Sequence, residues 1–300
     1  MCGIAGILST KKREIILDAI TSLSDLEYRG YDSAGIATIS DDESDSEIKV
    51  YKCLGAPSQN LNRKEIYKSI SGKARKTKVA IGHNRWATHG APTLLNAHPH
   101  IDCLSELALV HNGTILNYEY LRKKLEKAGH KFVSDTDTEV IAHQIEESRK
   151  ISPSPEEAIL HSIALLEGSF GLVILFRDKP DKLYLAKNGS PINIGIAEDQ
   201  FIVASSVNAI LRYTDKFIPL KDGEFAILDV EDEIPKYKIF DFKNGRIDEV
   251  KRDTNTIEGV VREDLSKGEY SSFMLKEIFE GIIYRDIVSR YRMNAVAART

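Results

Sequence analysis

The feature that most constrains the fold is a series of short apolar segments between residues 170 and 241. Gly, Pro, Asp and Asn separate these segments, which read GLVILF, KLYLAK, INIGIA, QFIVAS, EFAILD and KYKIF. Apolar strands that recur about every ten residues, with turn residues between them, are typical of antiparallel sheets. We therefore predict an antiparallel β-region in this part of the chain.

The first half of the chain mixes both kinds of element. Apolar patterning predicts strands at 3–8, 34–39, 48–53, 78–84 and 107–111, and helices at 13–26, 117–128, 136–149 and 155–167. These strands and helices do not alternate one by one, as they do in a doubly wound parallel fold. The sequence therefore predicts an α+β fold in which helices and sheets form separate layers.

Composition excludes several classes of protein. The 300 residues carry a formal net charge of −4, and their Lys and Arg are scattered, which disfavours nucleic-acid binding. No apolar run approaches the roughly 20 residues of a transmembrane helix. The three cysteines include no C-x-x-C pair, and the short apolar N-terminal stretch does not resemble a secretion signal. We therefore expect a cytoplasmic protein with no membrane partner.

A cysteine follows the initiator methionine directly. If Met1 is removed, Cys2 carries both a thiol and an α-amine, and an α-amine titrates near pH ~8, well below a lysine. Such a nucleophile brings its own general base, as N-terminal nucleophile hydrolases do. The alternative is an inert buried thiol, since free cysteine often serves as a core residue.

Five further blocks accompany this cysteine in order: LEYRGYDSAGIA (26–37), GHNRWATHG (82–90), NAHPH (96–100), VHNGTILNY (110–118) and DTDTEVIAH (135–143). Together with Met-Cys-Gly-Ile at the start, they resemble the glutaminase domain of class II glutamine amidotransferases. Within that family they are most similar to the glutaminase half of glucosamine-6-phosphate synthases, the isomerizing glutamine–fructose-6-phosphate transaminases. The resemblance covers about residues 2–245 and extends into YSSFMLKEIFE at 270–280.

The resemblance implies a fold, a reaction and a substrate. The fold is the N-terminal nucleophile hydrolase fold, a four-layer α-β-β-α sandwich of two antiparallel sheets. The reaction is hydrolysis of the side-chain amide of L-glutamine through a Cys2 thioester, which supplies nitrogen for making glucosamine 6-phosphate from fructose 6-phosphate. No cofactor is expected.

Each block offers groups for that reaction. Cys2 is the expected nucleophile, and Asn112 and Gly113 offer an amide and a backbone N–H to a developing oxyanion. The alternative for Asn112 and Gly113 is a simple Asn-Gly turn.

The remaining groups are expected to hold the substrate or to order the site. Arg85 can bind the substrate carboxylate as a bidentate fork, and Asp137 can bind its ammonium group. The alternatives are a surface salt bridge for Arg85 and a helix N-cap for Asp137. The resemblance adds Trp86, Thr88, His89 and Gly113 to the substrate-binding residues, and Arg29, His98 and His111 as residues that order the site.

The histidines do not predict a metal site. Five of the eight lie between residues 83 and 111, but they lack the helical spacing and the cysteine partners of known metal motifs. We therefore expect no metal among them.

The end of the chain departs from the family pattern. We expect a glutaminase domain at 1–245, followed at 246–300 by a linker and a C-terminal helix, with no sugar-phosphate isomerase domain. An ammonia acceptor is then expected in trans. The apolar stripe of the helix, within 270–296, needs a partner, for which a second copy of the chain is a candidate. Two alternatives stay open: the glutaminase subunit of another class II amidotransferase, and a non-catalytic regulatory remnant of the synthase.

Overall fold

A computed structural model describes residues 2–42, 45–61, 76–87, 90–152, 154–242 and 247–256. These residues belong to one compact unit, Met1–Glu258. The helix predicted within 270–296 lies outside the described residues, as do Thr88 and His89.

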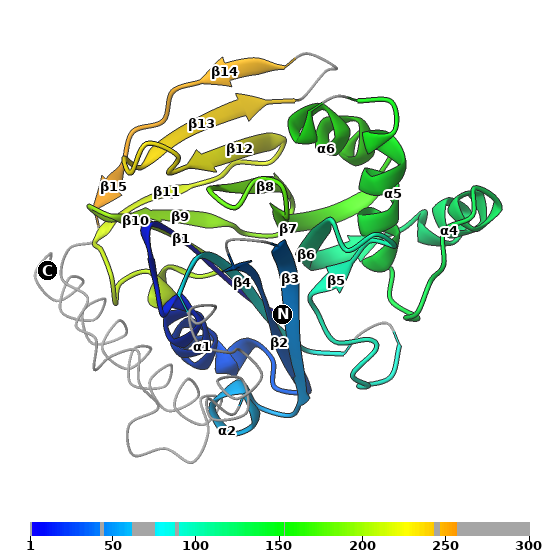
Figure 1. The fold of residues 1–300 in the computed structure, drawn as a ribbon, viewed down its shortest axis with the longest axis horizontal. Helices are drawn as coiled ribbons and strands as arrows, with labels where there is room; N and C mark the ends of the chain where they lie inside the picture. Colours follow the sequence, from blue (N-terminus) through cyan, green and yellow to red (C-terminus); the bar gives the residue numbers. More distant parts are fainter. Residues whose placement is uncertain are drawn as a thin grey trace, which may run out of the picture. The chain divides into compact units, whose positions relative to one another are not determined.

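Two antiparallel sheets form the centre of this unit (Figure 1). The first sheet has the strand order β15 (Asn255–Thr256), β11 (Lys216–Pro219), β9 (Asn193–Ile196), β10 (Gln200–Ala204), β1 (Gly3–Arg13), β4 (Thr77–Arg85), β2 (Ser33–Asp42) and β3 (Asp45–Leu54). The second has the order β14 (Asp248–Val250), β13 (Lys236–Asp241), β12 (Glu224–Asp229), β8 (Lys182–Asn188), β7 (Gly168–Phe176), β6 (Leu107–Ile115) and β5 (His100–Ile101).

Helices cover the outer faces of both sheets. Helix α1 (Ile15–Asp25) packs on the first sheet, and α4 (Tyr118–Lys127), α5 (Glu139–Arg149) and α6 (Pro155–Ile163) pack on the second. The short elements η1 (Glu27–Arg29), α2 (Pro57–Asn60) and η3 (Val207–Ala209) lie in the connections. The result is the predicted order of layers, helix, sheet, sheet and helix, so the α+β prediction is confirmed.

The alternation of side chains along each strand explains the layers. In β1, Ile4 and Leu8 belong to the core between the sheets, whereas Ala5 and Ile7 belong to the core under α1. Successive side chains of a strand point to opposite faces, so a strand that is apolar at every position is buried on both. Each fully buried Ile or Leu contributes roughly 1.5–3 kcal/mol. Strands of this type therefore sit in the middle layers.

Most predicted elements are present, and the differences are short strands that were not predicted and a longer β6. Strand β11 was not predicted, and Asn112 and Gly113 lie inside β6 where a turn was the alternative. Strands β14 and β15 follow residue 245, within the stretch predicted to be linker, and they pair with β13 and β11. Edge strands this short and exposed carry no hydrophobic period, which explains why the sequence did not indicate them.

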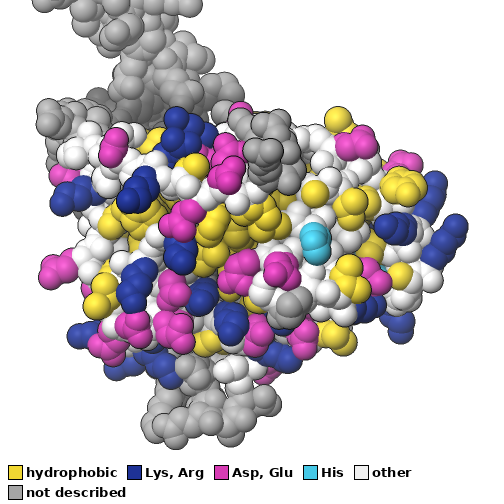
Figure 2. All heavy atoms as spheres, turned by 90° about the horizontal axis from the view of Figure 1, so that it is seen from above, with side chains coloured by type: hydrophobic (Ala, Val, Ile, Leu, Met, Phe, Trp, Pro, Cys, Tyr) yellow, Lys and Arg dark blue, Asp and Glu magenta, His cyan; other side chains and the backbone are white. Residues whose placement is uncertain are grey.

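The described part of the chain holds no helix that is long and apolar enough to cross a membrane. On the face viewed in Figure 2, apolar side chains gather in the middle, and charged side chains of both signs border them. A groove on the second sheet, lined by Ile227, Tyr237 and Phe240, is likewise bordered by charged residues such as Lys182 and Asp229.

Candidate active site

Cys2 lies at the start of β1, which is an interior strand of its sheet. Strand β1 pairs with β4 on one side and with β10 on the other. The backbone N–H of Ile4 also donates to Ser205 Oγ at 3.0 Å. Because the strand is bonded on both sides, the backbone next to Cys2 is held in place.

The thiol of Cys2 is partly buried. Burial raises its pKa above the ordinary value, and the hydrogen bond that the backbone N–H of Trp86 donates to Sγ, at 3.2 Å, acts against this rise. The charge of Arg85 also favours the thiolate. The thiol is therefore mainly protonated near neutral pH and needs a base in order to react.

A pocket opens at this thiol. It is lined by Cys2, His83, Arg85, Trp86, His98, His111, Gly113, Thr136, Asp137 and Thr138. These residues come from the start of the chain beside β1, from β4 and the residue after it, from the segment before β5, from β6 and from the segment that leads into α5. The pocket thus brings together the predicted nucleophile, the predicted substrate-binding residues Arg85, Trp86 and Asp137, and Gly113.

Asn112 lies beside the pocket, where a buried histidine fixes the orientation of its amide. His83 Nε2 is 3.0 Å from both Asn112 Oδ1 and the carbonyl oxygen of His111, so Nε2 carries the hydrogen. Burial lowers the pKa of His83 to about 3, and the ring is neutral. Asn112 Nδ2 therefore points the other way and donates to the carbonyl oxygen of Cys2 at 2.9 Å.

Gly113 can only be glycine in this conformation. Its φ is +131°, and an added Cβ would lie 2.1 Å from the carbonyl oxygen of Ser169. The close approach of β7 thus leaves the pocket wall at Gly113 without a side chain.

Arg85 ends β4 and is 4% exposed, which excludes the surface salt bridge that was its alternative. Its guanidinium donates to the carbonyl oxygens of Ala91 at 3.2 Å and Gly90 at 3.1 Å. The backbone N–H of Ala87 donates to Asp32 Oδ2 at 2.9 Å, which fixes the chain just after β4. Trp86, between them, is 42% exposed at the pocket.

Asp137 is buried, and it does not cap α5. Its Oδ2 accepts the backbone N–H of Ile115 at 2.8 Å, and the cap position belongs to Thr138, whose side chain makes no capping bond. The N-cap alternative for Asp137 is therefore wrong. The carboxylate instead links the segment before α5 to the end of β6, at the pocket wall.

Two histidines order the segment that carries Asp137. His98 Nδ1 accepts the backbone N–H of His111 at 3.3 Å, and His111 Nε2 faces the carbonyl oxygen of Ser169 at 3.4 Å. Both rings then meet the hydroxyl of Thr138, to which His98 donates at 3.5 Å and from which His111 accepts at 2.9 Å.

A stack of imidazole rings extends this network. His98 stacks on His83 with centroids 4.0 Å apart and meets His100 edge-on at 4.7 Å. His100 Nε2 in turn lies 3.1 Å from Thr136 Oγ1. Gly35 makes room for this arrangement, since an added Cβ would lie 2.2 Å from the carbonyl oxygen of His98.

Among the predicted site residues that the structure describes, Asn112 lies beside the pocket and Arg29 is not part of it. Arg29 does not line it, and its Nε donates to Tyr28 Oη at 3.1 Å.

Sequence reasoning missed Thr136 and Thr138, although both stand inside the quoted blocks. Their polar side chains, adjacent in the sequence to predicted site residues, could have indicated them.

Comparisons with known proteins place the chain among glutamine amidotransferases. A family model described as a glutamine amidotransferase domain matches residues 91–212. The glutamine–fructose-6-phosphate aminotransferase (isomerizing) of Pyrococcus horikoshii is 41% identical over 280 residues, which is 93% of this chain and 44% of that protein. The enzyme of the same name from Thermococcus kodakarensis is 44% identical over 281 residues, which is 93% of this chain and 43% of that protein.

A solved structure has the same fold. The glutamine phosphoribosylpyrophosphate amidotransferase of B. subtilis, complexed with ADP and GMP, superimposes with a TM-score of 0.60 at 27% identity. The match covers 79% of this chain and 48% of that one. The chain thus spans less than half the length of the curated relatives it matches.

Proposed function

Since the chain belongs to the class II glutamine amidotransferases, we propose that its pocket hydrolyses the side-chain amide of L-glutamine to glutamate and ammonia. One observation carries this proposal. Cys2, Arg85 and Asp137, far apart in the sequence, line a single pocket. Glutamine presents an amide carbon for a nucleophile to attack, and an α-carboxylate and an α-ammonium that a positive and a negative side chain can bind.

The reaction begins with the thiol of Cys2. After removal of Met1, the α-amine of Cys2 takes the thiol proton, and the sulfur attacks the amide carbon. The C–N bond then breaks, and the α-ammonium passes its proton to the leaving ammonia. Water, deprotonated by the same amine, hydrolyses the γ-glutamyl thioester and restores the thiol.

The oxyanion is stabilised at the end of β6. Asn112 Nδ2 uses one N–H for the carbonyl of Cys2, and its second N–H serves the oxyanion together with the backbone N–H of Gly113. His83 supports this by holding Asn112 Oδ1 away from the pocket.

The amino-acid end of glutamine is held by opposite charges. Arg85 binds the α-carboxylate and Asp137 the α-ammonium, with Trp86 at the pocket mouth. Thr88 and His89 also contact the substrate in this proposal. His98 and His111 order the segment that carries Asp137 through their contacts with Thr138. Arg29 stays a predicted ordering residue that acts through Tyr28.

We further propose that the ammonia aminates a sugar phosphate, as the names of the curated relatives suggest. The acceptor domain lies outside residues 1–245 in this proposal, either further along the polypeptide or in another subunit. Mixing the chain with the acceptor half of the Thermococcus relative, and measuring glucosamine 6-phosphate made from glutamine and fructose 6-phosphate, tests this part.

Glutaminase activity is tested by ammonia release from glutamine, using protein whose loss of Met1 is verified by mass. We expect Cys2→Ala to abolish release and the control Cys53→Ala to retain it. A chain with one extra residue left before Cys2 should also be inactive, because its α-amine is acylated. Wild-type turnover by Cys2→Ala would rule out the proposal.

A further inference from the structure

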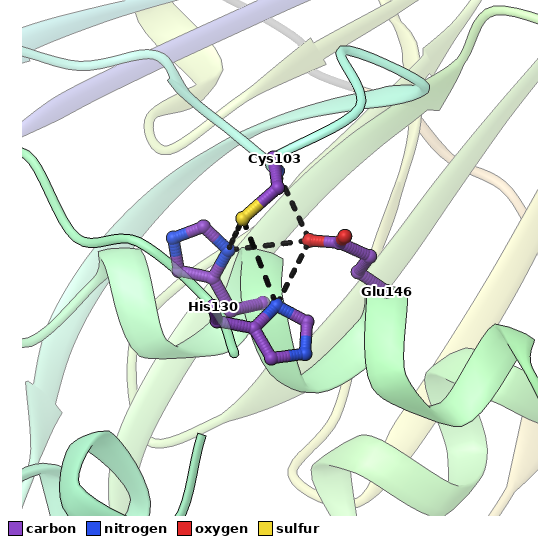
Figure 3. A group of neighbouring side chains, drawn as sticks. Cys103, His130 and Glu146 are labelled. Carbon is purple, nitrogen blue, oxygen red and sulfur yellow. Dashed lines mark hydrogen bonds and ion pairs between the residues drawn. The ribbon is translucent and has the colours of Figure 1, made fainter. Parts of the chain in front are cut away.

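Four metal-ligating side chains converge at a second place, outside the pocket. They are Cys103, His130, His143 and Glu146, and one ligand atom from each lies within 4.8 Å of all the others (Figure 3). Cys103 follows β5, His130 lies between α4 and α5, and His143 and Glu146 stand three residues apart on α5. None of the four lines the pocket at Cys2.

We propose that these four side chains bind a zinc ion in tetrahedral geometry. Zinc bonds of about 2.3 Å to sulfur, 2.1 Å to nitrogen and 2.0 Å to oxygen separate neighbouring ligand atoms by roughly 3.3–3.6 Å. Cys103 Sγ lies 3.5 Å from His143 Nδ1 and 3.8 Å from His130 Nδ1. Glu146 Oε2 lies 3.3 Å and 3.1 Å from the same two nitrogens. One ion at the centre is therefore within reach of all four.

The contacts of Nε2 in each histidine support a metal ion at Nδ1 of the same ring. His130 Nε2 lies 2.8 Å from Glu147 Oε2, and His143 Nε2 lies 3.4 Å from Glu139 Oε1. Both rings thus face a carboxylate at each nitrogen, but a neutral imidazole carries one N–H. A metal on Nδ1 resolves this, because Nε2–H then donates to the outer carboxylate, as in carboxylate–histidine–zinc arrangements.

The ligand set selects zinc among divalent ions. Thiolate with imidazole favours zinc over magnesium or calcium, which prefer oxygen ligands. The backbone N–H of Lys131 donates to Cys103 Sγ at 3.4 Å, which stabilises a thiolate. Cys103 is exposed, which gives the ion a path from solvent.

The ion would stabilise the segment that precedes Asp137. Glu139, the outer partner of His143, also accepts the backbone N–H groups of Val133 at 2.8 Å and Ser134 at 2.7 Å. A zinc ion would therefore connect the turn after β5, the loop before α5 and α5 itself. This structural role does not depend on the proposed glutaminase reaction.

The test strips the full chain with a chelator and titrates it with Zn²⁺ and, separately, with Co²⁺. We expect one equivalent of each metal per chain, a higher Tm with zinc, and a thiolate-to-cobalt charge-transfer band in the near ultraviolet. Cys103→Ser should lose that band and bind zinc at least about a hundredfold more weakly, because even outer partners contribute about 10–100-fold. Glu147→Gln should weaken binding by about tenfold and keep the band.

Two matched variants separate this site from other thiols. Cys53→Ser and Cys2→Ser should keep both the band and the zinc affinity, since neither residue belongs to the cluster. The proposal is overturned if the chain takes up no stoichiometric metal, or if Cys103→Ser binds as the wild type does. It is equally overturned if the band disappears in Cys2→Ser, which would place the metal at the nucleophile. Because Cys103 is exposed, its serine variant is expected to fold, as circular dichroism would verify.

Discussion

At the residue scale, Asn112 has the most specific surroundings. Its oxygen accepts from His83 and its nitrogen donates to the carbonyl of Cys2, so the direction of the amide is set before any substrate binds. A donor that needs no reorientation stabilises a transition state better than one that does.

We therefore expect Asn112→Ala to lower kcat for glutamine hydrolysis by about 10²–10³, or roughly 3 kcal/mol of barrier, with little change in KM. Steady-state ammonia release measures this. Asn60→Ala, an exposed change on α2, serves as the control and should retain the wild-type rate. A fall of less than about tenfold in Asn112→Ala would argue against an oxyanion role.

At Asp137, a substitution can remove the negative charge and keep the hydrogen bond. Asp137→Asn can keep the oxygen that accepts from Ile115 and removes only the negative charge. We expect KM for glutamine to rise by about 10–100-fold while kcat changes little, because a hydrogen bond to a charged group contributes about 1.5–3 kcal/mol. If the loss falls on kcat alone, Asp137 does not bind the substrate ammonium.

At the element scale, the imidazole stack makes the stability of the chain depend on pH. Burial lowers the pKa of His83 to about 3 and holds the pKa of His98 well below its usual value. Between these values and about pH 6.5, the unfolded chain binds protons that the folded chain does not. The contribution of these neutral histidines to the free energy of unfolding is therefore fully present above about pH 6.5 and decreases as the pH falls below it.

We expect the free energy of unfolding to drop by up to about 1.4 kcal/mol per pH unit for each such histidine, below pH 6.5. Urea unfolding between pH 7.5 and 5 measures the slope. His98→Gln should have a shallower slope than the wild type. A flat profile down to pH 5 would contradict neutral, buried rings.

Strands that are buried on both faces could be predicted from the sequence. Strand β7 is apolar at nearly every position, because one face lies between the sheets and the other lies under the helices. Strands β14 and β15 have no such pattern, since they are exposed and pairing with a neighbour defines them, and the four-residue β11 buries only Ile218 in the core between the sheets. The apolar pattern of the sequence therefore does not predict strands that are defined by pairing with a neighbour.

In the site, too, the sequence predicted some residues and not the contacts that arise from tertiary packing. Motif resemblance indicated Cys2, Arg85 and Asp137, but the hydroxyl of Thr138 between His98 and His111 exists only after β6 and α5 have packed together. The cluster at Cys103 was missed because the histidines were judged by their crowding between residues 83 and 111. The spacing His143-x-x-Glu146, on one face of a helix, was the available signal.

At the scale of the whole molecule, the two sheets extend beyond residue 245, where the glutaminase domain was predicted to end. The guanidinium of Arg252 pairs with Glu224, with Nε donating to Oε1 at 2.8 Å. The side chain of Glu224 is 1% exposed, so its charge needs this partner. The folded unit therefore includes residues beyond 245.

We expect Arg252→Gln to destabilise the chain by on the order of 3 kcal/mol, because it leaves a buried carboxylate without its partner. Chemical denaturation measures the change. Lys251→Gln, at the adjacent exposed position, is the control and should have almost no effect. Equal stability of the two variants would mean that the domain does end near residue 245.

The position of β1 affects the order of events during synthesis. The strand next to Cys2 is the first to be made, yet its neighbour β10, together with Ser205, is made only when two thirds of the chain has been translated. A growing polypeptide can therefore not hold its nucleophile in place early on. Fragments that end before β10 should therefore lack the proposed glutaminase activity, which ammonia release from a chain truncated at residue 199 would measure.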